Sequence, residues 1–501
     1  MQQKKRLLIY AGIVFILHLF GNPHYGFFRD ELYFIACGLR PAWGYVDQPP
    51  VTPLLAAGSQ VFGHSLFLLR AVPAIFAAAS VYVTGLLVIE FGGGTFALTL
   101  SALAAFFCPV LMNFGMKMST DMPGLFLWPL AALFVVRTLK GGNQQNWIYT
   151  GLALGMSFQA KISVLFFAAS LFAGLLFTRH RRSLLSMWCF WGAAVFAAIS
   201  LPYIAWQMHY DFPMMELLRN GQKGKNLTLS PADFMVAQLL ITNPFLALIW
   251  ISGLFWLIKH PTWRFLAIAW AVFMAEMIIL HGKHYYSANF YSILIAAGGV
   301  AIESWTSSIR RLRPLVSAFV VMAGLISVPF VMPILSEESF VEYNRVVAKS
   351  LHLESPKTEK HQDGPLPQDW ADMHGWPELT AAVAKVFQSL SPEERAKAVI
   401  MARNYGQASA IEFFGKDYAL PAVLSGHNQF YLWGTRGNTG EILIDVKGDC
   451  GKDTNLYRSS TLAATFTHSW VMPYENEIPI MICRGLNRPL EEIWTATKFY
   501  W

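Results

Sequence analysis

Carboxylates and single cations recur in the short polar segments that separate the long apolar runs of this chain. Asp30 and Glu31 follow the first run, Asp121 lies in a later segment, and Lys161 and Lys283 interrupt apolar surroundings further along. A cation suits a phosphate or pyrophosphate group, and a carboxylate suits a general base that deprotonates an acceptor hydroxyl or amine. Because phosphate is a good leaving group, these residue types predict transfer of a group from a phosphate ester to a positioned acceptor.

These polar residues also have structural explanations. Asp121 precedes Met122-Pro123, a pattern that is typical of a helix N-cap. Asp30 and Glu31 could be ordinary charges at a membrane interface. We favour the functional interpretation because the pattern repeats on one predicted face of a membrane, where ionisable residues are functional by default.

The elements that must position these residues are apolar runs, which recur from Leu7 to about Leu335. Only 14% of the 501 residues are charged, whereas soluble domains carry about a quarter, and the mean hydropathy is +0.40. Each run can cross a hydrocarbon core about 30 Å thick. We predict an α-helical polytopic membrane protein with about 11 transmembrane helices, at residues 7–22, 66–90, 95–115, 122–139, 147–159, 162–178, 186–206, 234–258, 264–281, 287–304 and 315–335.

Basic residues mark the segments that we expect to be cytoplasmic. Such segments carry an excess of Lys and Arg in membrane proteins, and here they are residues 4–6, 137–140, 179–182, 259–264 and 310–313. The net charge of +7 therefore reflects topology, and we do not expect nucleic-acid binding. The first helix is expected to stay uncleaved. An odd number of spans then predicts an extracytoplasmic C-terminus.

Two further parts complete the predicted architecture. The transmembrane catalytic domain is expected to comprise residues 1–335, and its first outer loop comprises residues 21–65. Within this loop, two helices are expected to lie in the membrane interface, at residues 27–38 and 50–62. Residues 336–501 are predicted to form a soluble extracytoplasmic α/β domain, with strands at 398–402 and 441–446, helices at 375–390 and 405–414, and a flexible loop at 355–367. A disulfide between Cys450 and Cys483 is allowed there.

Several motifs occur along the chain in a fixed order on one predicted membrane face. They are Asp30-Glu31, Asp47-Gln48-Pro49-Pro50, Phe62-Gly63-His64-Ser65, Arg70-Ala71-Val72-Pro73, Thr120-Asp121-Met122-Pro123, Ala160-Lys161 and Gly282-Lys283-His284-Tyr285-Tyr286. At these residues the chain resembles the GT-C superfamily of glycosyltransferases. More closely, it is similar to dolichyl-phosphate-mannose–protein mannosyltransferases and to the bacterial lipid A aminoarabinose transferase.

The resemblance implies a role for each matching residue. The acidic residue of the family's first loop, its proposed catalytic base, maps to Asp30, and Glu31 matches the second acidic position. Asp121 matches the acid that helps organise the site. The predicted substrate-binding residues are Arg70, Lys161, Lys283, His284 and Tyr285.

The resemblance also implies the reaction. We expect a membrane glycosyltransferase that moves a hexosyl or pentosyl group from a polyprenyl-phosphate donor to a lipid, glycan or protein acceptor, on the periplasmic side of an inner membrane. No cofactor is predicted. Some GT-C enzymes need a divalent ion, but the branch resembled here generally does not, and no carboxylate cluster in the sequence demands one.

Two other functions use similar residues. A transporter or flippase for a lipid-linked sugar would also need cations and an apolar groove, but such proteins often show two similar halves with charges at the midplane. The sequence shows no internal repeat, and its charges gather on one face. A non-catalytic scaffold is the third possibility. The polar and aromatic segment at residues 427–434 either packs on its own domain or contacts the acceptor.

Overall fold

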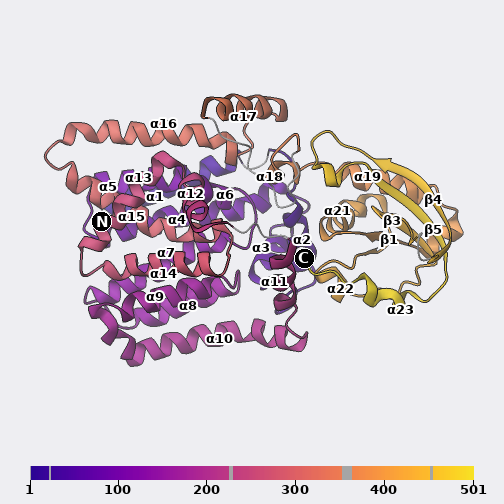
Figure 1. The fold of residues 1–501 in the computed structure, drawn as a ribbon, viewed down its shortest axis with the longest axis horizontal. Helices are drawn as coiled ribbons and strands as arrows, with labels where there is room; N and C mark the ends of the chain where they lie inside the picture. Colours follow the sequence, from indigo (N-terminus) through magenta and orange to yellow (C-terminus); the bar gives the residue numbers. More distant parts are fainter. Residues whose placement is uncertain (1, 22–23, 225–228, 352–363, 452–454) are drawn as a thin grey trace.

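The computed structural model describes residues 2–21, 24–224, 229–351, 364–451 and 455–501. Figure 1 shows a bundle of helices with an α/β unit packed at one end. The short helices α2 (Arg29–Gly38) and α3 (Val51–Gly58) lie between the two, where the sequence predicts the helices of the first loop. They therefore join the bundle to the α/β unit.

The helices of the bundle follow the apolar runs. By length and composition, five helices in the described part of the chain could cross a membrane, and up to eight could do so if each bent pair counts as one span. The bundle consists of α1 (Gln2–Gly21), α4 (Leu66–Glu90), α5 (Thr95–Phe107), α6 (Pro109–Met116), α7 (Met122–Leu139), α8 (Asn146–Phe158), α9 (Val164–Leu176), α10 (Met187–His209), α12 (Pro231–Ile241), α13 (Pro244–Lys259), α14 (Arg264–Ile279), α15 (Ala288–Trp305) and α16 (Arg313–Val331).

Two predicted spans are broken instead of continuous. The run at 95–115 bends by 65° between α5 and α6, and the run at 234–258 bends by 107° between α12 and α13. Pro109 and Pro244 open the second helix of each pair. Proline lacks the amide hydrogen that would continue the preceding helix, but its backbone angle suits a first helical position. The predicted break after Gln159 is confirmed, because α8 ends at Phe158 and α9 begins at Val164.

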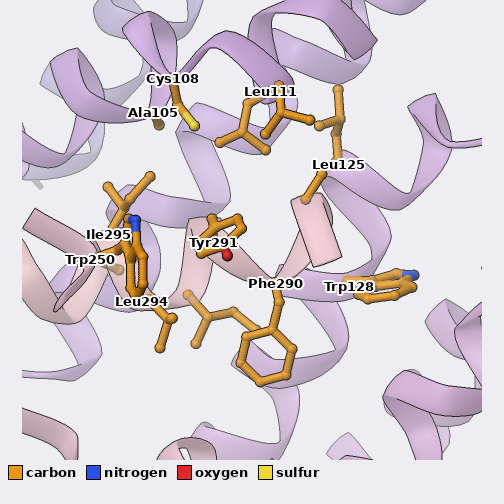
Figure 2. Packing of buried hydrophobic residues seen from close by; sticks show 14 of the residues in the cluster. Ala105, Cys108, Leu111, Leu125, Trp128, Trp250, Phe290, Tyr291, Leu294 and Ile295 are labelled. Atoms are coloured by element: carbon orange, nitrogen blue, oxygen red, sulfur yellow. The ribbon is translucent and has the colours of Figure 1, made fainter. Parts of the chain in front are cut away.

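Helix α15 is the centre of the bundle. In its most apolar stretch of 18 residues, 83% is buried inside the protein. The corresponding share is 17% for α10 and 22% for α16. Figure 2 shows Phe290, Tyr291, Leu294 and Ile295 of α15 among aromatic and aliphatic side chains of neighbouring helices. The close approach of α13 depends on glycine, because a Cβ at Gly298 would lie 2.0 Å from the Ile249 carbonyl oxygen. The buried faces hold α15 in place, and α15 begins next to the polar segment at 281–287.

The α/β unit is built on a five-stranded sheet of order β2-β1-β3-β5-β4. Strand β1 pairs in parallel with β2 and β3, whereas β3–β5 and β5–β4 are antiparallel. The strands are β1 (Ala398–Ala402), β2 (Val423–Leu424), β3 (Ile442–Val446), β4 (Tyr457–Phe466) and β5 (Ile478–Leu486). Only β1 and β3 were predicted from the sequence.

Helices connect the sheet to the bundle. Helices α19 (Trp376–Gln388) and α21 (Tyr405–Phe414) correspond to the two predicted helices, and α21 packs on α2. A disulfide joins Cys450 to Cys483. Helix α17 (Glu337–Leu351) follows the bundle, and most of the predicted loop at 355–367 lies outside the described residues. Helix α11 (Pro213–Gly224) and the last residues of the chain meet, because Asn220 donates to the Tyr500 carbonyl oxygen.

Candidate active site

The start of α2 is fixed by a buried ion pair. Glu31 accepts a hydrogen bond from the Phe28 amide at 2.9 Å, which caps the helix, and another from the Met118 amide at 3.0 Å. The Arg70 guanidinium donates to both carboxylate oxygens, at 3.2 and 3.1 Å. Both side chains are 0% exposed. Glu31 and Arg70 therefore hold α2 against α4 and against the segment that leads to α7.

Arg70 also organises the segment before α2. It donates to the carbonyl oxygens of His24 and Gly26, at 3.0 and 2.7 Å. Arg70 was expected to bind substrate, and Glu31 was expected to be catalytic. In the structure the two side chains form a buried ion pair with each other. A buried pair of this kind cannot contact a substrate directly in this conformation. We assign both residues a positioning role.

Asp30 lies beside this pair and is accessible. Its side chain is 35% exposed, and one oxygen, Oδ1, accepts a hydrogen bond of 2.7 Å from the Tyr405 hydroxyl. Arg29 Nε lies 3.7 Å from the same oxygen. Burial raises the pKa of Tyr405 well above its usual value, so the phenol remains a donor. Asp30 is therefore held through one oxygen, and its other oxygen can accept a proton.

Arg29 links this carboxylate to the α/β unit. Its amide donates to the Asp372 carbonyl oxygen at 3.0 Å, and its guanidinium lies 3.5 Å from the Asp372 carboxylate. Burial raises the pKa of Asp372 to about 6, and the Arg29 charge opposes that rise. Arg29 therefore lies close to the carboxylates of both Asp372 and Asp30.

A second polar group surrounds Lys161, in the break between α8 and α9. The ammonium donates to Asp121 Oδ2 at 2.5 Å. It also lies over the rings of Tyr286 and Tyr285, at 4.4 and 5.6 Å from their centroids. The side chains of Lys161 and Asp121 remain 20% and 10% exposed. Asp121 is at the N-cap position of α7 but makes no side-chain cap hydrogen bond, so the structure does not support the alternative explanation of Asp121 as a helix cap.

The segment before α15 adds a further cation to this group. Lys283 Nζ lies 5.7 Å from the Tyr285 ring centroid, so the ammonium groups of both Lys161 and Lys283 lie near this ring. His284 follows, and its carbonyl oxygen accepts a hydrogen bond from Gln238 of α12. The structure thus brings together Asp121, Lys161, Lys283 and Tyr285, with His284 adjacent in the chain. Lysine ammonium groups gathered at one place suit the binding of a phosphate.

Residues 117–123 connect the two groups. Met118 donates its amide to Glu31, and Asp121 follows three residues later. The Lys117 ammonium lies 4.4 Å from the centroid of the Phe28 ring and 2.7 Å from Asp369 of the α/β unit. The carboxylates of the first loop and the Lys161 group therefore lie at the same end of the bundle, on either side of one short connection.

Sequence reasoning missed the contribution of the α/β unit. Tyr405 of this unit donates a hydrogen bond to Asp30. Asn428 Nδ2, also in this unit, lies 3.4 Å from Asp47 Oδ2. Tyr33 of α2 donates to the other Asp47 oxygen, Oδ1, at 2.9 Å. The Tyr33 and Tyr405 rings pack 4.7 Å apart. The polar segment that begins at His427 gave a weak signal, because its amides could either pack on their own domain or contact another surface. In the structure they contact the first loop.

In the described part of the chain, one group of side chains is close enough together to be considered as a metal site. The group contains Asp445, Cys450 and Cys483. The two cysteines form the disulfide, so neither offers a thiolate ligand. This group is therefore not a metal site.

Comparisons with known proteins bear on the fold of the chain. Residues 47–206 match the family model of dolichyl-phosphate-mannose-protein mannosyltransferases. ArnT from Cupriavidus metallidurans bound to undecaprenyl phosphate superposes with a TM-score of 0.62 at 13% sequence identity, covering 95% of this chain and 98% of that one. The apo state of ArnT gives 0.61 at 12% identity, over 96% and 98%.

The chain shares the overall fold of ArnT. Arabinofuranosyltransferase AftD from Mycobacteria is also similar in fold, with a TM-score of 0.52 at 11% identity, over 97% of this chain and 42% of that chain. A search of curated protein sequences finds no significant match. The comparisons support the predicted resemblance, and the long apolar helices indicate a multi-pass membrane protein.

Proposed function

We propose that this chain transfers a sugar from a polyprenyl-phosphate donor to an acceptor on the extracytoplasmic face of an inner membrane. The observation that carries the proposal is that an accessible carboxylate, Asp30, and the cationic Lys161 group lie at the same end of a helical bundle that resembles ArnT. ArnT, which shares the fold, has been solved with undecaprenyl phosphate. A lipid-phosphate donor is consistent with both findings.

Each residue has a defined part in the proposed reaction. The acceptor O–H or N–H gives its proton to the free oxygen of Asp30 while its heteroatom forms a bond to the anomeric carbon. The bond from that carbon to the donor phosphate breaks, and the phosphate takes the electron pair. Lys161 and Lys283 stabilise the departing charge. Asp121 positions Lys161, and Tyr285 and His284 border the phosphate.

The C-terminal α/β unit participates directly in this arrangement. Tyr405 holds the Asp30 oxygen that is not needed for proton transfer. Glu31 and Arg70 keep the helix that carries Asp30 in place. We therefore propose a catalytic domain of residues 1–335 with eleven spans and an extracytoplasmic domain of residues 336–501. The disulfide supports this orientation, because such bonds persist in oxidising compartments.

Transfer from a synthetic donor tests the proposal. Purified protein is mixed with a polyprenyl phosphate that carries a radiolabelled sugar and with a detergent extract of envelope lipids and glycans. Release of free polyprenyl phosphate together with a labelled acceptor product supports the proposal. In sealed vesicles, movement of intact donor across the membrane without release of polyprenyl phosphate would instead indicate a flippase.

A further inference from the structure

One edge of the sheet gathers three polar residues from three different loops of the α/β unit. Asn404 comes shortly after β1, Lys447 directly follows β3, and Glu475 comes shortly before β5. Because β1 and β3 are parallel and β5 is antiparallel to β3, these positions lie at the same edge. In open α/β sheets, the carboxyl ends of parallel strands form the edge at which functional residues usually lie. Helix α21 begins at this edge and packs on α2.

Glu475 fastens the first turn of α21 to this edge. Its Oε1 accepts a hydrogen bond of 2.8 Å from Asn404 Nδ2, and its Oε2 accepts one of 2.7 Å from Gln407 Nε2. The Lys447 ammonium lies 3.3 Å from Oε1, and the Glu475 side chain is 6% exposed. Asn404 also caps the helix, because its Oδ1 accepts from the Gln407 amide. One buried carboxylate therefore holds both ends of the turn that contains Tyr405.

The same turn approaches α2 closely at Gly406. A Cβ at this position would lie 2.6 Å from Arg29 Cδ and closer still to Arg29 Cγ. Carbon atoms in contact lie about 3.5–4.0 Å apart, so an alanine would force Arg29 and the turn apart. The backbone of Gly406 has no positive φ, and alanine favours a helix more than glycine does. The close approach of Arg29 therefore explains the glycine, and the helix itself does not require it.

Tyr405 lies between these two contacts and extends them to Asp30. Its hydroxyl donates to Asp30 Oδ1 at 2.7 Å, and the Arg29 guanidinium lies 5.4 Å from the centroid of its ring. A side-chain hydrogen bond is lost when its heavy atoms are about 3.6 Å apart, so a movement of about 1 Å breaks this one. The residues that fix the turn therefore also fix the hydrogen bond to Asp30.

We infer that Glu475 and Gly406 are positioning residues for the general base, and that they act through the Tyr405 hydroxyl. The inference rests on the proposed function, because it takes Asp30 as the group that accepts the proton. Glu475 fixes the turn to the sheet, and Gly406 lets the turn lie against α2. Tyr405 then holds one oxygen of Asp30 while the other oxygen accepts the proton.

Gly406→Ala tests the close approach. Purified full-length protein is supplied with the labelled synthetic donor and the envelope extract, and kcat and the donor KM are measured separately. The kcat should fall about tenfold, because the base is misplaced, and the donor KM should not change, because the Lys161 group lies on other segments. Gly58→Ala is the matched control, since a Cβ at Gly58 meets no atom within 4 Å. An unchanged kcat in Gly406→Ala would overturn the role of Gly406.

Glu475→Gln tests the hold on the turn. The substitution replaces one acceptor oxygen by an amide, which cannot accept from Asn404 or Gln407, so kcat should fall about tenfold with an unchanged donor KM. Adding Asn404→Asp exchanges donor and acceptor in one hydrogen bond and keeps a good helix cap. The double variant should recover to within about threefold of the wild-type kcat, because both hydrogen bonds to residue 475 are restored. No recovery, or no loss in Glu475→Gln, would overturn the role of Glu475.

A double-mutant cycle tests whether these residues act through the Tyr405 hydroxyl. In the Tyr405→Phe background, Gly406→Ala and Glu475→Gln should each lower kcat by less than about twofold more, because the group through which they act is already absent. A residue that only stabilises the fold would cause its full loss in either background. Full tenfold losses in the Tyr405→Phe background would therefore overturn the inference.

Two comparisons separate this inference from the proposed function. Full turnover in Asp30→Asn would refute the base itself, whereas full turnover in Gly406→Ala and Glu475→Gln, with a loss in Asp30→Asn, would refute only the positioning role. Hydrogen exchange of the amides in α2 and α21 needs no turnover. It should become faster in Gly406→Ala and Glu475→Gln but not in Gly58→Ala. Unchanged exchange in the first two variants would overturn the inference even in the absence of any detected transfer.

Discussion

Replacing Glu31 by leucine tests whether this residue positions the site or takes part in the chemistry. The substitution leaves the fully buried Arg70 guanidinium without its carboxylate. Removing one partner of a buried ion pair costs about 3–5 kcal/mol of stability. It also leaves the amides of Phe28 and Met118 without an acceptor, and each unsatisfied buried donor costs about 1–3 kcal/mol. These contributions share partners and are not additive, so we expect a loss of at least about 3–5 kcal/mol.

The assay combines thermal unfolding with turnover per folded molecule. Glu31→Leu should unfold at a clearly lower temperature than the wild type. Glu31→Gln keeps one acceptor oxygen and should lose less. The double variant with Arg70→Leu should unfold at a higher temperature than Glu31→Leu alone, because it removes the uncompensated charge. If Glu31→Leu instead unfolds like the wild type and loses turnover, Glu31 is a catalytic group and the positioning role is wrong.

Three further predictions concern the donor site, the α/β unit and the topology. Lys161→Met and Lys283→Met remove a charge from the phosphate site with little change in side-chain length, so donor binding measured by titration should weaken about tenfold or more; normal binding in both variants would refute the phosphate role. Tyr405→Phe removes the hydroxyl that holds Asp30, so kcat should fall about tenfold while donor affinity stays unchanged; an unchanged kcat would show that Tyr405 only packs. A reporter fused after Trp501 should be active only in an extracytoplasmic compartment, and activity in the cytoplasm would reverse the orientation.

The positions of the helices could be predicted because apolar runs and their interruptions are local properties of the sequence. Gln159 and Lys161 mark a break by their charge and polarity alone. The bends at Pro109 and Pro244 were missed, because an apolar run that contains proline can continue with a kink or stop. Strand β4 (Tyr457–Phe466) was missed since most of its residues are exposed and its polar and apolar residues do not alternate.

The candidate site was predicted as a set of residues but not as an arrangement. Asp30 and Glu31 are adjacent in sequence, yet successive residues of a helix point about 100° apart, so Glu31 enters the core while Asp30 remains accessible. The contact of Tyr405 with Asp30 joins residues 375 positions apart. Nothing in the local sequence around either residue indicates such a pairing, which follows only from the packing of α21 on α2.

Substitution of Asp30 by asparagine tests the central claim most directly. The change keeps the size of the side chain and an acceptor for Tyr405 but removes the basic oxygen, so transfer from the synthetic donor should fall about 10²–10⁴-fold, with donor binding and thermal unfolding unchanged. Asp211→Asn is the matched control, because Asp211 is exposed and its φ of 57° suits asparagine. A variant Asp30→Asn that transfers sugar at the wild-type rate per folded molecule would contradict the assignment of Asp30 as the general base.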